Sequence, residues 1–169
     1  MSSADETKIE IKPATESDVP LILSLIKDLA DYEKLSHEVV ATESILRESL
    51  FGEHPYAEVS IGYYDSIPAG YTLFFHSFST FTGRPGVYIE DIFVKEAYRG
   101  KGVGKALFLY VAGLAKARNC KRIEYSVLTW NQPALNFYEQ FGAQLMDDWR
   151  LFRISGDSLK ELVLNTLNR

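Results

Sequence analysis

The chain has 169 residues, of which 46% are hydrophobic and 24% charged, and these ordinary globular values exclude disordered and fibrous proteins. Its net charge of −5 disfavours nucleic acid and anionic membranes as partners and favours the steering of small cationic molecules. We expect one domain over 1–169 with a flexible start at 1–8. A cytoplasmic location is expected, because the lone cysteine (Cys120) needs no oxidising compartment and neither a secretory signal nor a membrane-spanning run is visible.

The first third of the chain predicts one strand and two helices. Apolar residues alternate with charged ones over 9–13, which is a strand pattern. Thr15 and Asp18 have the spacing of a capping box and open a helix that runs to Tyr32. A second, shorter helix covers 42–51.

Three strands are predicted next. The segments 57–64 and 69–80 are rich in β-branched and aromatic residues. The turn-forming tetrad 65–68 between them predicts a hairpin. Another turn at 82–86 leads into a third strand at 87–94.

Two adjacent carboxylates, Glu90 and Asp91, interrupt the apolar strand at 87–94. Carboxylates are rarely placed in a buried strand unless they are paired or functional. In a regular strand the two side chains point to opposite faces, and a β-bulge, a feature common beside active sites, could re-aim either one. The alternative is that both are structural and bond neighbouring turns.

A glycine-rich loop with Gly100, Gly102 and Gly104 follows this strand and precedes a helix whose apolar stripe runs from Val103 to Leu114. Each glycine costs about 0.5 to 1 kcal/mol relative to alanine, so some gain must offset the three. Residues without side chains let several backbone N–H groups approach one anion, and a helix N-terminus adds partial positive charge. The loop therefore predicts a phosphate site, although it is neither a Walker loop nor the dinucleotide fingerprint. A glycine-rich turn without a ligand is the alternative.

The last part of the chain predicts alternating strands and helices. We expect a strand at 122–128, a helix at 132–141 ended by Gly142, a strand at 149–154 and a helix from Asp157. Antiparallel strands followed by this alternation predict an α/β (mixed α+β) fold, in which a mixed sheet carries helices on both faces.

Several stretches resemble one enzyme superfamily. Arg99-x-x-Gly102-x-Gly104 matches the pattern [QR]-x-x-G-x-[GA] by which the GNAT acyl-CoA N-acetyltransferases hold the pyrophosphate of coenzyme A. Four further stretches look like the spermidine/spermine N-acetyltransferases and the related thialysine acetyltransferases: F-G-E-H-P (51–55), Y-I-E-D-I-F-V (88–94), W-N-Q-P-A-L-N-F-Y (130–138) and W-R-L-F-R-I (149–154). Two stretches, L-A-D-Y-E-K-L-S (29–36) and W-N-Q (130–132), are more similar to the thialysine acetyltransferases.

The resemblance covers 11–154 and implies both a fold and a reaction. The fold would be the GNAT fold, a mixed, mostly antiparallel sheet of about six to seven strands with helices on both faces. The reaction would use acetyl-CoA and no metal, and would transfer acetyl directly to the terminal amine of a small cationic molecule. His54 and His76 also lack the spacing of metal ligands.

The resemblance also implies which residues act. Glu90 would be the base, directly or through water, and Tyr138 would protonate or stabilise the departing thiolate. The coenzyme would contact Ile92, Phe93, Val94, Arg99, Gly100, Lys101, Gly102, Val103, Gly104, Lys105, Asn131, Gln132, Pro133 and Ala134. The acceptor would contact Tyr32, Glu33, Glu90, Asp91, Glu124, Tyr125 and Ser126.

The identity of the acceptor stays open. A thialysine-like or lysine-like compound, a diamine, and a polyamine such as spermidine all fit the expected carboxylates. Acetylation of protein lysines or N-termini is a different enzymatic alternative, and a coenzyme-A-binding sensor is the non-enzymatic one. The acetyltransferases that this sequence resembles typically form two-fold dimers. We therefore also expect a homodimer, with 149–154 as the segment for strand exchange or contact.

Overall fold

The computed structural model of the chain describes residues 8–167, which fall into two units, Met1–Ser126 and Val127–Arg169. Residues 1–7 of the predicted flexible start lie outside the described residues.

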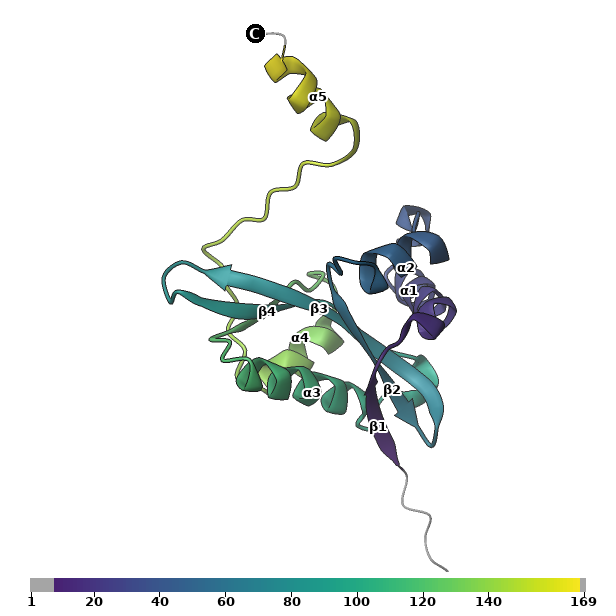
Figure 1. The fold of residues 1–169 in the computed structure, drawn as a ribbon. Helices are drawn as coiled ribbons and strands as arrows, with labels where there is room; N and C mark the ends of the chain where they lie inside the picture. Colours follow the sequence, from purple (N-terminus) through teal and green to yellow (C-terminus); the bar gives the residue numbers. More distant parts are fainter. Residues whose placement is uncertain (1–7, 168–169) are drawn as a thin grey trace, which may run out of the picture. The chain divides into compact units, whose positions relative to one another are not determined.

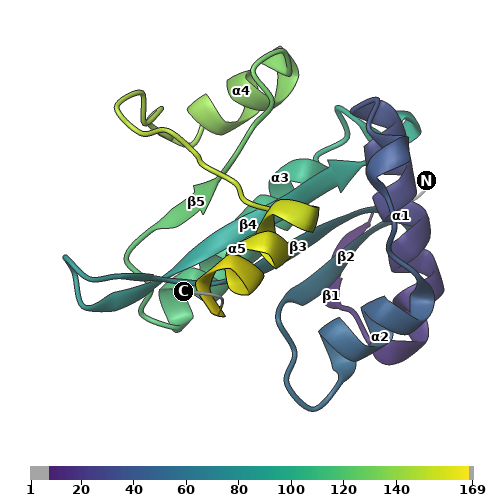
Figure 2. The ribbon, with the colours of Figure 1, turned by 90° about the horizontal axis from the view of Figure 1, so that it is seen from above.

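The first unit contains a five-stranded sheet in the order β1-β2-β3-β4-β5. The first four strands are antiparallel and β5 is parallel to β4, and the β3–β4 hairpin is the longest part of the sheet (Figure 2). The strands are β1 (Ile9–Pro13), β2 (Glu58–Tyr64), β3 (Ile67–Ser79), β4 (Arg84–Val94) and β5 (Ile123–Tyr125).

Helices cover both faces of this sheet, as predicted (Figure 1). On one face, α1 (Val19–Tyr32) and α2 (Glu43–Phe51) enclose a core with Val59, Tyr71 and Phe93. On the other, α3 (Val103–Ala117) packs on Ala69 and the first two strands. The mixed α/β class and the GNAT-type architecture are therefore confirmed.

Local sequence signals explain where the helices begin. Thr15 and Asp18 form the expected capping box, in the short 3-10 turn just ahead of α1. The Thr42 hydroxyl accepts the N–H of Ile45 at the start of α2. Such caps satisfy donors that have no partner inside the helix.

The β2–β3 turn is tighter than the predicted tetrad. Asp65 and Ser66 alone form it, both with positive φ angles (48° and 65°), while Ile67 already belongs to β3. Two successive residues with positive φ are the mark of a type I′ turn, whose twist matches that of the strands. The turn therefore sets the register of this hairpin.

The second unit contains α4 (Gln132–Glu139) and α5 (Gly156–Leu167). The predicted strand at 149–154 is wrong, because these residues have no strand conformation and no neighbouring strand. Their apolar side chains stay exposed, with Phe152 90% accessible and Leu151 79%. Without this strand, the described residues hold five strands. The strand predicted at 122–128 is present as β5 but is shorter than expected. A β pattern without a pairing partner cannot satisfy its backbone groups as a strand.

Candidate active site

A β-bulge in β4 separates the two adjacent carboxylates. Asp91 pairs with Leu73 and Ile89 with Phe74, so Glu90 has no partner on β3 and is the extra residue. Leu73 and Phe74 are neighbours on β3, so their side chains face opposite sides of the sheet. Their partners on β4, Asp91 and Ile89, therefore also face opposite sides. The bulge thereby turns Asp91 to the face that carries α1, where the Tyr71 hydroxyl donates a 2.9 Å hydrogen bond to it.

The strands β4 and β5 part at the same place. β5 pairs with β4 only over Val87, Tyr88 and Ile89. Beyond them, Ile92, Phe93 and Val94 have no strand on that side among the described residues. Their side chains pack in the two cores, so their backbone edge is the part free to meet a ligand.

The glycine loop has the backbone that a phosphate cradle needs. Gly100 and Gly102 take φ angles of 72° and 92°, a region that favours glycine. Gly102 is the N-cap of α3, and no side chain caps this end. The N–H groups of the first helical turn have no partner inside the helix, so they can bind an anion.

Side chains around the loop are oriented by aromatic rings. The Arg99 guanidinium carbon lies 4.3 Å from the centre of the Tyr32 ring, and its Nε donates to the Val94 carbonyl at 3.0 Å. The Lys101 ammonium lies 5.0 Å from the centre of the Tyr64 ring. Val103 is buried, so only its backbone could touch a coenzyme, whereas the Lys105 side chain is exposed.

Two further carboxylates, Glu33 and Glu90, act on the pKa of Asp91. The pKa of Asp91 is raised to about 6, mainly by burial and in addition by the charges of Glu90 and Glu33, while the hydrogen bond from Tyr71 opposes the rise. Partial burial also raises the pKa of Glu33, which caps the C-terminus of α1. The charges of Glu33 and Glu90 are therefore near enough to act on the pKa of Asp91.

The raised pKa of Asp91 predicts a pH-dependent stability. Because folded Asp91 binds a proton more tightly than the unfolded chain, its ionisation destabilises the fold as pH rises from about 4 to above 6. Asp91→Asn keeps an acceptor for Tyr71 and removes the charge. We expect its stability relative to wild type to improve by at most about 3 kcal/mol between pH 4 and pH 7, from the pKa difference. Urea unfolding across this range measures it, and parallel curves for the two proteins would contradict it.

The structure does not bring all predicted acceptor residues together. Ser126 lies on the Asp91 side of the sheet, where its hydroxyl is 2.7 Å from that of Tyr88. Glu124 is held by Arg122 in an ion pair of 2.7 Å. Tyr125 pairs in register with Ile89 and contacts the Phe108 ring of α3, so it faces away from Asp91. An aromatic contact of Tyr125 with a cation at Asp91 is therefore not supported.

In the second unit, the predicted residues sit on or beside α4. The Asn131 side chain caps this helix by accepting the N–H of Ala134, and Pro133 lies in the first turn. Gln132 donates to the side chain of Asn136. Tyr138 is buried and its ring meets the edge of Phe137. Their roles toward coenzyme and thiolate stay predictions.

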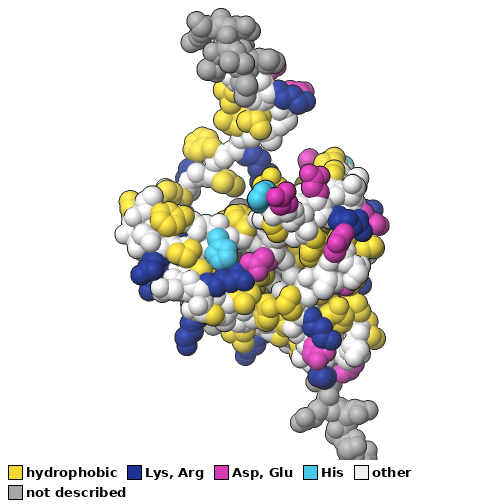
Figure 3. Space-filling model, in the orientation of Figure 1, with side chains coloured by type: hydrophobic (Ala, Val, Ile, Leu, Met, Phe, Trp, Pro, Cys, Tyr) yellow, Lys and Arg dark blue, Asp and Glu magenta, His cyan; other side chains and the backbone are white. Residues whose placement is uncertain are grey.

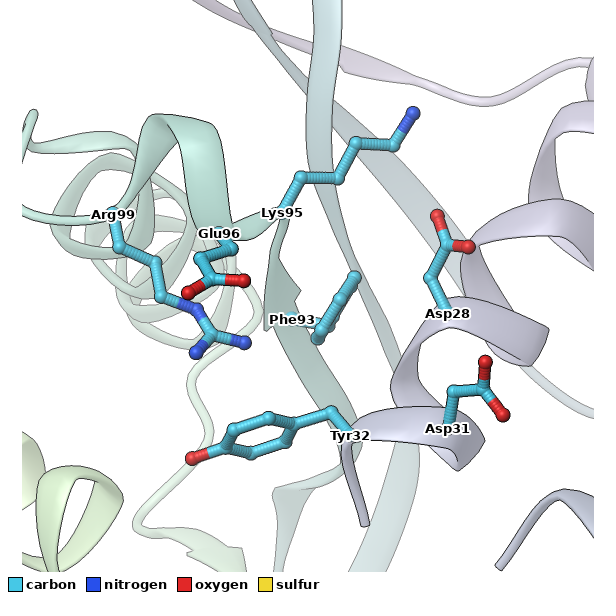
Figure 4. A pocket seen from close by; sticks show the side chains of 7 residues that line it. All are labelled: Asp28, Asp31, Tyr32, Phe93, Lys95, Glu96 and Arg99. Carbon is cyan, nitrogen blue, oxygen red and sulfur yellow. The ribbon is translucent and has the colours of Figure 1, made fainter. Parts of the chain in front are cut away.

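Sequence reasoning missed Tyr71 as the partner of Asp91. Tyr71 sits in an apolar strand, and its pairing depends on the bulge, for which the sequence carries no local signal. It also missed a pocket lined by Asp28, Asp31, Tyr32, Phe93, Lys95, Glu96 and Arg99 (Figure 4). Asp28 and Asp31 lie on the predicted first helix, far in the sequence from Lys95 and Glu96, so no local pattern connects them.

Comparisons with known proteins identify the family and the fold. The sequence profile of the Acetyltransferase (GNAT) family matches residues 23–143. The chain is 38% identical to the thialysine N-epsilon-acetyltransferase of Bos taurus, covering 91% of this chain and 96% of that protein. It is 35% identical to an L-ornithine N5-acetyltransferase of Arabidopsis thaliana, covering 90% and 86%. A solved integron cassette protein from V. cholerae superposes with a TM-score of 0.78 at 25% identity, covering 92% and 97%.

The chain therefore belongs to the GNAT acetyltransferase family and is an acyl-transferring enzyme. Acetyl-CoA is the co-substrate of this family. Among residues 8–167, no group of acidic, histidine and cysteine side chains could hold a metal ion. In the same range, no helix is long and apolar enough to cross a membrane.

Proposed function

We propose that this protein transfers acetyl from acetyl-CoA to the terminal primary amine of a small cationic amine, with a thialysine-like or lysine-like acceptor preferred. The observation that carries the proposal is the bulge at Glu90, which places Glu90 and Asp91 where β4 and β5 part, within the electrostatic influence of Glu33 at the end of α1. The names of the thialysine and ornithine acetyltransferase relatives support the acceptor class. The region 1–169 would act as one catalytic domain.

The coenzyme would be held by the loop and by backbone. The N–H groups after Gly102 and the exposed glycine at 100 fit a pyrophosphate, and Arg99 adds a fixed positive charge. The backbone edge of Ile92 to Val94 that β5 leaves unpaired, apart from the Val94 carbonyl that Arg99 already occupies, would hold the pantetheine arm and the acetyl carbonyl. When bound, the coenzyme supplies an acetyl group activated as a thioester. Residues 131–134 would complete the contacts.

The carboxylates would bind and deprotonate the amine. An amine with a pKa near 10.4 is protonated at neutral pH, and removing its proton costs about 4 to 5 kcal/mol unless the site helps. Glu90, exposed on the bulge, would accept this proton directly or through water, while Glu33 and Asp91 hold the cation. Tyr138 would stabilise or protonate the thiolate that leaves. The nitrogen–carbonyl bond forms as the carbon–sulfur bond breaks.

A panel of acceptors tests the acetyl transfer and ranks its substrates. Steady-state thiol release from acetyl-CoA is measured with thialysine, lysine, ornithine, putrescine, spermidine and a lysine-bearing peptide under one condition. We expect the highest kcat/KM for thialysine. A spermidine value at least tenfold higher would make the enzyme a polyamine acetyltransferase, and preference for the peptide would overturn the small-amine acceptor. Coenzyme binding without thiol release for any amine would indicate a sensor.

We further propose a cytoplasmic homodimer, without nucleic acid or membrane as partner. The net charge of −5 and the lone cysteine support this setting. Exposed apolar residues support the assembly: Phe78 and Phe81 toward the turn of the β3–β4 hairpin, and Trp149, Leu151 and Phe152 in the second unit. Figure 3 shows hydrophobic side chains gathered at the hairpin end of the sheet. Such patches are typical of protein contacts.

We expect sedimentation at high micromolar concentration to give twice the 19.1 kDa of one chain. Leu151→Asp together with Phe152→Asp should shift the protein to the monomer, because two carboxylates would have to be desolvated in the contact. The matched control, Val40→Asp, changes another exposed apolar residue. A wild-type mass of one chain would contradict the homodimer.

A further inference from the structure

A pocket lies between α1 and the residues that follow β4, with an acidic wall on α1 and, opposite, a wall that carries two cations and the Glu96 carboxylate beside Arg99. Its volume is about 470 Å³ and all of its lining residues belong to the first unit. Asp28 and Asp31 project from α1, whereas Lys95 and Arg99 come from the end of β4 and the residues after it (Figure 4). The ring of Phe93 lies between the two walls.

The charges that face this pocket are largely uncompensated. Lys95 and Asp28 form no ion pair with any residue in the described part of the chain, and Asp31 accepts only a hydroxyl hydrogen bond, from Ser36. Arg99 is already fixed by the Val94 carbonyl and the Tyr32 ring. Lys95 is thus the cation of the pocket that can turn to a ligand carboxylate, and the aspartates can take an ammonium.

We propose that this pocket binds the α-amino-acid head group of the acceptor, with the carboxylate at Lys95 and the α-ammonium at Asp28 and Asp31. The inference rests on the proposed acetyl transfer to a small amine and assigns it a specificity site. A zwitterion carries both charges on one carbon, so it can bridge the two walls. A diamine or polyamine lacks the carboxylate and would leave Lys95 without a partner.

The spacing along β4 fits such a substrate. Phe93 and Asp91 share the α1 face, because the Tyr71 side chain contacts both the core around Phe93 and the Asp91 carboxylate. Two residues of a strand span about 7 Å. In an extended lysine-like side chain, five bonds of about 1.5 Å in a zigzag put the terminal nitrogen about 6 Å from the α-carbon. A head group over Phe93 therefore lets the reacting amine reach the carboxylates at Asp91 and Glu90.

A matched pair of substrates tests the inference. Thialysine and bis(2-aminoethyl) sulfide present the same reacting end, but the sulfide lacks the carboxylate. With Lys95→Gln we expect kcat/KM for thialysine to fall about tenfold, mainly through KM, because one charge-assisted hydrogen bond is lost. The kcat/KM for the sulfide should stay unchanged. Lys95→Glu should go further and favour the sulfide. Lys116→Gln, an exposed lysine on α3, is the control for net charge.

The outcomes separate this inference from the proposed function. If wild type acetylates no amine of the acceptor panel, the proposed function fails, whereas acetylation of other amines but not of thialysine overturns the head-group site alone. If both are acetylated and Lys95→Gln leaves their ratio unchanged, the head-group site is wrong while the acetyl transfer stands. A variant that instead weakens acetyl-CoA binding, measured by calorimetry without acceptor, would assign Lys95 to the coenzyme and also overturn the inference.

Discussion

Gly102→Asp is expected to abolish acetyl-CoA binding. Gly102 is the N-cap of α3, so an aspartate there puts a carboxylate where the coenzyme phosphate would bind. Two like charges about 4 Å apart near a protein surface repel by about 4 kcal/mol, which corresponds to about a thousandfold in affinity. Titration calorimetry with acetyl-CoA measures the loss directly.

The matched control for this variant is Gly102→Asn. Asparagine and aspartate have the same shape and both tolerate positive φ better than other side chains, so the backbone strain at φ 92° is shared. In both variants the added Cβ meets the Ile9 side chain, 3.3 Å away. The difference between the two affinities is thus an effect of charge. Equal affinities in wild type and Gly102→Asp would remove the pyrophosphate from this loop.

Tyr138→Phe is expected to lower kcat about a hundredfold with little effect on acetyl-CoA affinity. The hydroxyl would matter when negative charge builds on the sulfur, and losing one such donor typically costs about 3 kcal/mol. Full proton transfer is not required. A phenol with a pKa near 10 is a weaker acid than a thiol near 8.5, so transfer would be uphill by about 2 kcal/mol without perturbation.

The test of this role needs the chemical step in isolation. Rapid-quench measurement of the first turnover gives its rate, and equilibrium binding gives the coenzyme affinity. Tyr56→Phe, which removes the hydroxyl of an 80% exposed tyrosine, is the control and should match wild type. An unchanged first-turnover rate in Tyr138→Phe would reduce Tyr138 to the packing contact that its ring makes with Phe137.

Much of the fold followed from local chemistry. The capping box at Thr15, the cap at Asn131 and the glycines before α3 act over a few residues, so the sequence predicted these helix starts correctly. The strand with Glu90 and Asp91 was also predicted correctly, because its strand pattern lies within a few residues. The failures were in segments whose state depends on a distant partner. Residues 149–154 have a strand pattern but find no neighbouring strand among the described residues.

By itself, the sequence determined the family, the helix starts and the presence of two carboxylates shortly before a glycine-rich loop. These features are written in residues close together in the chain. Only the tertiary structure decided which way the carboxylates point, because the register between β3 and β4 makes Glu90 the bulged residue and gives Asp91 the Tyr71 hydroxyl. It also decided that the aspartates of α1 face Lys95 across one pocket. Register and helix docking are set by packing across the whole sheet, which no short stretch of sequence encodes.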